Sequence, residues 1–88
     1  MTYQKMIQSD PHFNVMRITP DFIEFRSVNT GHYWTIKKRY FQNGCIYRLY
    51  HKHSCETEYY HLHKDNCYNV KSVINLIKNH DTWVLKNT

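Results

Sequence analysis

The sequence predicts an α+β fold: an antiparallel β-meander of four to five strands with one C-terminal helix packed on one face. Two patterns indicate this class. Between Ile23 and Lys64 the residues alternate in character with a period of two, and short turn signals interrupt the alternation. Beyond Asn69 the apolar residues fall instead at helical spacing. A length of 88 residues with two glycines and two prolines predicts a single small domain over 1–88.

The first element expected is a short helical segment within residues 1–12. Tyr3, Met6 and Ile7 recur at helical spacing. The pair Asp10-Pro11 ends the segment, because a proline forces the preceding residue out of the helical region.

Five alternating segments follow, each bounded by turn-forming residues. They predict strands over 13–18, 22–28, 33–41, 45–53 and 59–64. The strongest hairpin signal is Asn43-Gly44, since both residues tolerate the positive φ angles of a type I′ turn. A further turn is expected over 54–58.

The last regular element is a helix whose apolar stripe consists of Val70, Val73, Ile74 and Ile77. Asn69 is a suitable N-cap for it. Lys78 and His80 would then lie near the negative helix end. The tail over 82–85 is expected to form a short strand, or to pack against the domain through Trp83.

A two-residue loop at Asn43-Gly44 fixes which side chains share a face. It places Gln42 opposite Cys45 and Arg39 opposite Arg48. The predicted inner face, covered by the helix, consists of apolar and aromatic side chains: Ile23, Phe25, Trp34, Ile36, Tyr40, Tyr47 and Leu49. Cations interleaved with rings make up the opposite, outer face: Arg26, Tyr33, Lys37, Arg39, Phe41, Arg48, Tyr50 and Lys52.

The outer face predicts an acidic or phosphate-bearing partner. The chain carries a formal charge of +5, which favours anionic partners. Bases of single-stranded nucleic acid stack on rings while cations neutralise the phosphates. We therefore expect a small basic protein that binds nucleic acid, or a nucleic-acid-handling complex, through this face.

Two other function classes stay open. The first is an inhibitor or adaptor, of the kind that phages and mobile elements carry, which docks on an acidic host protein surface. The second is a small histidine-dependent ribonuclease, for which His61, His63, Arg48 and Tyr50 offer the residue types for proton transfer and phosphate stabilisation. Their spacing is not diagnostic and the sequence lacks a nucleophile elbow or a phosphate loop, so the sequence leans against an enzyme.

The register between the fourth and fifth strands decides the role of a histidine-rich segment. An even loop, for example Glu56-Thr57, would bury Tyr60 and Leu62 and would turn His61 and His63 to the outer face, where they would extend the binding surface. We favour this register because it buries more apolar area. An odd loop would instead bring four imidazoles together on one face as a zinc site: His51, His53, His61 and His63. Under the favoured register no cofactor is expected.

Cellular location is inferred from cysteine usage and hydropathy. The three cysteines are an odd number, and residues 1–9 lack the apolar run of a signal peptide. No stretch approaches the roughly 20 apolar residues of a membrane span. We expect a cytoplasmic protein with reduced thiols and no membrane partner.

Overall fold

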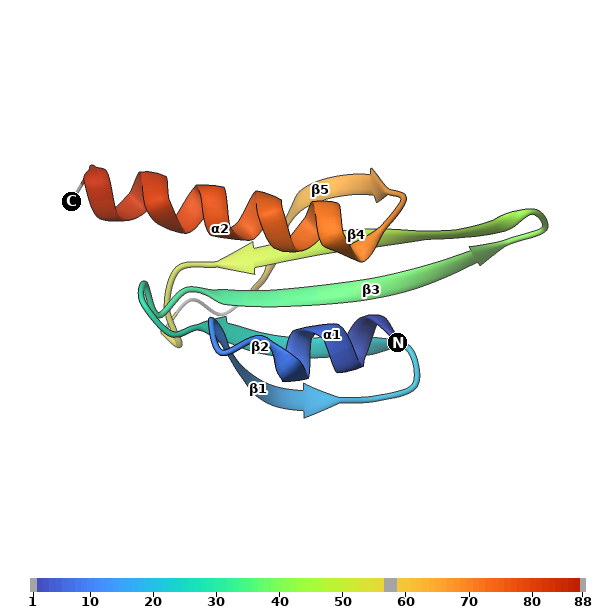
Figure 1. The fold of residues 1–88 in the computed structure, drawn as a ribbon, viewed down its shortest axis with the longest axis horizontal. Helices are drawn as coiled ribbons and strands as arrows, with labels where there is room; N and C mark the ends of the chain where they lie inside the picture. The colour runs from blue at the N-terminus through green and yellow to red at the C-terminus, as the bar shows by residue number, and fades with distance from the viewer. Residues whose placement is uncertain (1, 57–58, 88) are drawn as a thin grey trace.

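The computed structural model describes residues 2–56 and 59–87 and shows the expected α+β architecture. A short helix α1 (Tyr3–Ser9) precedes the sheet and a long helix α2 (Val70–Lys86) follows it. The five strands between them are β1 (Phe13–Ile18), β2 (Phe22–Ser27), β3 (Tyr33–Phe41), β4 (Gly44–Lys52) and β5 (His61–Cys67). They form one antiparallel sheet in the order β1-β2-β3-β4-β5, a simple meander (Figure 1).

Both helices pack on the inner face of the sheet. Side chains of α1 and α2 join one hydrophobic cluster with the strands, and the cluster includes Ile7 and Val73. The predicted inner-face residues form its centre, and five of them are fully buried: Ile23, Phe25, Trp34, Ile36 and Leu49. Burial of this kind stabilises by about 1.5–3 kcal/mol per large side chain. Tyr40 is the exception, with 71% of its surface exposed, because it lies near the end of the β3–β4 hairpin.

The β3–β4 hairpin turns one residue earlier than the sequence predicts, so the partner of each paired residue shifts by two positions. Phe41 pairs with Gly44, so the loop consists of Gln42 and Asn43. Only Gly44 has a positive φ there, at 150°, and the turn is therefore not the expected type I′ turn. The actual register places Ile36 opposite Leu49, which pairs two fully buried aliphatic side chains. A shift of two residues keeps every side chain on its predicted face.

The C-terminal tail does not form the predicted strand or packing hook. Helix α2 continues through it to Lys86, and Trp83 is 63% exposed. Asp81 anchors this part of the helix to the rest of the domain. Its carboxylate is fully buried and accepts hydrogen bonds from His12 and Thr30. Lys78 and His80 consequently lie within the helix rather than at its end.

The N-terminal caps follow the sequence signals. The Asn69 side chain accepts a hydrogen bond from the amide of Ser72, as expected of an N-cap. Thr2 caps α1 in the same way through the amide of Lys5. The turn predicted over 54–58 includes Thr57 and Glu58, which lie outside the described residues.

Two further observations concern chemistry and location. Cys45, Cys55 and Cys67 are free thiols. Among the described residues, no helix has the length and apolar character needed to cross a bilayer.

Candidate nucleic-acid interface and histidine cluster

The outer face carries its predicted cations, in a different pairing. Lys37 lies directly opposite Arg48, and Arg39 lies opposite Ile46. The predicted Arg39–Arg48 pair is therefore wrong, because the hairpin turns earlier. Lys37 and Arg48 are therefore like-charged neighbours on the outer face. Both helices cover the opposite face of the sheet.

Aromatic rings on this face lie under the cations. The ammonium of Lys37 is 5.0 Å from the Tyr50 ring centroid, and that of Lys52 is 5.4 Å from the Tyr33 centroid. Arg39 approaches Phe41 at 6.0 Å. These distances are typical of cation–π contacts, so Lys37, Lys52 and Arg39 each lie over a ring, and Lys37 and Arg39 remain exposed to solvent.

Most of the cations have no carboxylate partner. Within residues 2–56 and 59–87, no ion pair involves Arg26, Lys37, Arg39 or Lys52. Arg48 differs, because its Nε donates a hydrogen bond of 2.9 Å to Asp65. Four positive charges on this face are thus available to an anionic partner.

The outer face also contains a hollow that the sequence did not predict. Its volume is about 280 Å³, and it is lined by rings, cations and polar groups: Arg17, Phe22, Glu24, Thr35, Lys37, Tyr50 and Tyr60. Phe22 and Glu24 flank the inner-face residue Ile23. The alternation of side chains along a strand is therefore sufficient to assign both to the outer face. Arg17 could not, because a bulge between Val15 and Arg17 changes the register of β1.

Tyr60 is one of the residues that line this hollow. Its hydroxyl donates a hydrogen bond of 2.8 Å to Oε2 of Glu24, and burial raises the pKa of the phenol. The Lys52 ammonium lies 4.8 Å from the Tyr60 ring centroid.

The sequence prediction placed Tyr60 and Leu62 on the inner face. The structure places both on the outer face, where Leu62 lies opposite Tyr50.

The same register turns His61 and His63 away from the outer face, contrary to the prediction. His61 lies opposite His51 on the inner face, and His63 contacts the ring of Trp34 at 5.4 Å between centroids. The observed phase gives the hydroxyl of the partly buried Tyr60 an acceptor, Glu24, on the outer side. Arg48 and Tyr50 therefore do not share a face with His61 and His63, and the residues of the ribonuclease hypothesis are separated by the sheet.

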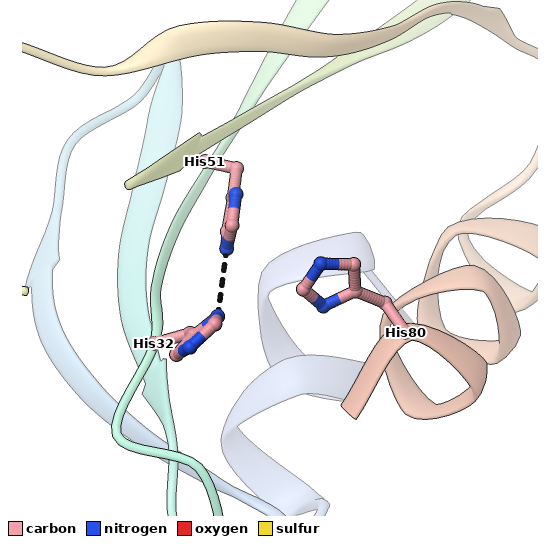
Figure 2. A group of neighbouring side chains, drawn as sticks. All are labelled: His32, His51 and His80. Carbon is pink, nitrogen blue, oxygen red and sulfur yellow. Dashed lines mark hydrogen bonds between the residues drawn. The ribbon is translucent and has the colours of Figure 1, made fainter. Parts of the chain in front are cut away.

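Histidines gather instead at one end of the inner face. His51 is only 1% exposed, and its ring lies 4.8–5.5 Å from five other imidazoles: His32, His53, His61, His63 and His80. His32 Nδ1 and His51 Nε2 are 2.9 Å apart and share a hydrogen bond. Figure 2 shows this pair with the ring of His80 reaching toward it from α2.

The remaining histidine, His12, is linked to the cluster through the carboxylate of Asp81. His12 Nε2 lies 2.7 Å from Oδ2 of the buried Asp81. The hydroxyl of Thr30 donates to Oδ1 of the same carboxylate at 3.0 Å. His80 Nδ1 is 3.9 Å from that oxygen, which is too long for a hydrogen bond.

Two sets of three imidazoles have ring nitrogens within 4.8 Å of one another: His32 with His51 and His80, and His51 with His61 and His63. The predicted four-imidazole set is thus only partly assembled, and His53 belongs to neither set. The metal site predicted from the sequence did not include His32 and His80, because both lie far from the histidine-rich segment. His32 lies in a turn and His80 lies on a helix.

Burial favours the neutral form of four imidazoles of the cluster: His51, His32, His63 and His80. The pKa of His51 is lowered to about 3 by burial first and by the neighbouring histidines second, His80 foremost. The pKa values of His32, His63 and His80 are lowered by the same cause. Neutral imidazole is the form that donates a lone pair to a metal.

Comparison with known proteins identifies no relative: no protein-family model, curated protein or solved structure matches this chain.

Proposed function

We propose that this chain binds single-stranded nucleic acid through the outer face of its sheet. One observation carries the proposal: four cations without an ion pair among the described residues alternate with aromatic rings on a face that neither helix covers. Cations of this kind neutralise phosphates, and rings offer stacking platforms to unpaired bases.

The hollow beside Tyr50 supports single strands over a duplex. Its volume of about 280 Å³ is close to the lower end of small-molecule sites, about 300 Å³, so a splayed base is of suitable size. Phe22, Tyr50 and Tyr60 supply rings around it, and Lys37 lies at its wall. Bases in a duplex remain stacked on each other and do not reach such a hollow.

Fluorescence anisotropy with labelled oligo-dT and oligo-U at two or more salt concentrations tests the proposal. If all four unpaired cations contact phosphates, the slope of log K against log salt should be about −3. Affinity no better than millimolar at low salt for both oligonucleotides would reject nucleic-acid binding.

A double charge reversal tests the face. Lys37→Glu with Arg39→Glu should abolish most of the affinity and flatten the salt dependence. Lys5→Glu with Lys71→Glu is the matched control, because both lysines are exposed on the helices of the other side. Each substitution changes the charge by two units, so both double variants carry +1 in place of +5. Equal loss in the two would indicate net charge rather than this face.

Stacking is tested separately. Tyr50→Ala should cost about 1–3 kcal/mol of binding free energy, whereas Tyr68→Ala, which removes an exposed tyrosine from the segment between β5 and α2, should cost nothing. Poly-glutamate offers negative charge without bases. If it binds as tightly as the oligonucleotides, the nucleic-acid proposal fails and an acidic protein surface becomes the preferred partner.

A further inference from the structure

The histidine cluster carries an inference that is independent of the outer face. His32 precedes β3, His51 lies on β4 and His80 lies on α2, so three separate elements deliver one imidazole each to the same point (Figure 2). Their ring nitrogens lie within 4.8 Å of one another. Ligands of a tetrahedral site with Zn–N bonds of about 2.1 Å stand about 3.4 Å apart, so small rotations of the rings suffice.

Hydrogen bonding leaves this group under-satisfied. The one hydrogen bond within the set joins His32 to His51. His80 Nδ1 is buried and has no hydrogen-bond partner among the described residues. Buried polar atoms without partners are uncommon in proteins and call for an explanation such as an ion.

The surroundings suit a cation as well. Asp81 is fully buried beside His80, with its Oδ1 3.9 Å from His80 Nδ1. Its carboxylate is held by His12 and Thr30. A fixed negative charge at this distance would offset part of the charge of a divalent ion in a desolvated site.

We propose that His32, His51 and His80 bind one divalent transition-metal ion, with Zn²⁺ as the expected ion, and thereby fasten α2 to the sheet. An all-imidazole set suits zinc, copper, nickel and iron far better than calcium or magnesium. Three protein ligands leave a fourth position for solvent.

The alternative set of His51, His61 and His63 is the weaker candidate. His61 is exposed, and His61 and His63 come from the same strand. Both sets need His51, so the two ions would compete for it, and substitutions distinguish the sets.

The test is titration of tag-free, EDTA-stripped protein with Zn²⁺ by calorimetry, together with thermal unfolding. We expect one ion per chain and a higher unfolding temperature, because a ligand that binds only the folded state stabilises it. His32→Gln and His80→Gln should each weaken binding by more than the roughly 10–100-fold that loss of an outer-shell partner costs. His61→Gln is the matched control and should bind as the wild type does.

Circular dichroism of the metal-free variants separates lost ligation from lost folding. If His80→Gln fails to fold, His32→Gln still decides, because His32 lies in a turn outside the hydrophobic cluster. Co²⁺ should give the d–d absorption of a site with nitrogen and oxygen ligands and no thiolate charge-transfer band. Three results would overturn the proposal: no Zn²⁺ binding at micromolar concentrations, unchanged binding in both ligand variants, or loss of binding in His61→Gln alone.

Discussion

Lys37 lies directly opposite Arg48 on the two central hairpin strands, so two like charges face each other across the outer side of the sheet. Like charges at directly opposed positions destabilise a strand pair. The carboxylate of Asp65 accepts a hydrogen bond from Arg48, and its negative charge offsets part of this repulsion.

The first prediction concerns that pair. Lys37→Glu places a carboxylate opposite Arg48, and we expect a higher urea midpoint at low salt together with weaker oligonucleotide binding. Lys5→Glu, on α1, is the control and should change neither quantity much. A lower midpoint for Lys37→Glu would contradict this prediction and would show that the contact of Lys37 with the Tyr50 ring outweighs the repulsion from Arg48.

The second prediction concerns Asp81. Asp81→Ala leaves His12 and Thr30 without their buried acceptor. Loss of hydrogen bonds to a buried charged group should lower the free energy of unfolding of the metal-free protein by about 1.5–3 kcal/mol. Urea unfolding measures this, and Asp21→Ala, at an exposed position, is the control. Equal stability of the two variants would show that Asp81 does not anchor α2.

The third prediction concerns the stability of the metal-free protein at acidic pH. Burial, together with the neighbouring His80, His32, His53 and His63, lowers the pKa of His51 from 6.5 to about 3. Between those two pH values the unfolded chain binds a proton that the folded chain does not, so stability falls as pH falls. At pH 5 the metal-free protein should have lost about 2 kcal/mol through His51 alone.

Chemical unfolding between pH 7 and pH 4 measures that loss. Imidazole resonances in NMR give the assignment, because the His51 ring should remain neutral throughout the range in which the protein stays folded. A midpoint near 6.5 for His51 would contradict its burial.

The fourth prediction concerns Tyr60. Tyr60→Phe removes the hydroxyl that donates to Glu24 and leaves the ring in place. Because the site is partly exposed, we expect a loss of only about 1 kcal/mol in unfolding free energy. Leu62→Ala, on the same face, is the control for packing. An unchanged stability in Tyr60→Phe would mean that this hydrogen bond does not set the phase of β5.

Sequence patterns predicted the layers of this fold because they follow from burial. Trp34, Ile36 and Leu49 had to share a face, and any register of the correct parity achieves this. The exact hairpin register was missed, since the turn signal at Asn43-Gly44 competes with the packing of Ile36 against Leu49.

The phase of β5 was missed for a different reason. Apolar area favoured burying Tyr60 and Leu62, but the Tyr60 hydroxyl bonds Glu24 on the outer side. Such a contact joins residues 36 positions apart and leaves no local signal. The convergence of His32, His51 and His80 is hidden in the same way, because it depends on how α2 crosses the sheet.

The β3–β4 hairpin extends well beyond its neighbouring strands (Figure 1). β2 pairs with β3 only as far as Lys37, and β5 pairs with β4 only from Tyr47 onward. Its far end is therefore a two-stranded ribbon with few buried contacts, which opens locally at low cost. Amide hydrogens near Tyr40 should accordingly exchange with deuterium much faster than those of Trp34 and Ile36, which exchange only when the whole domain unfolds.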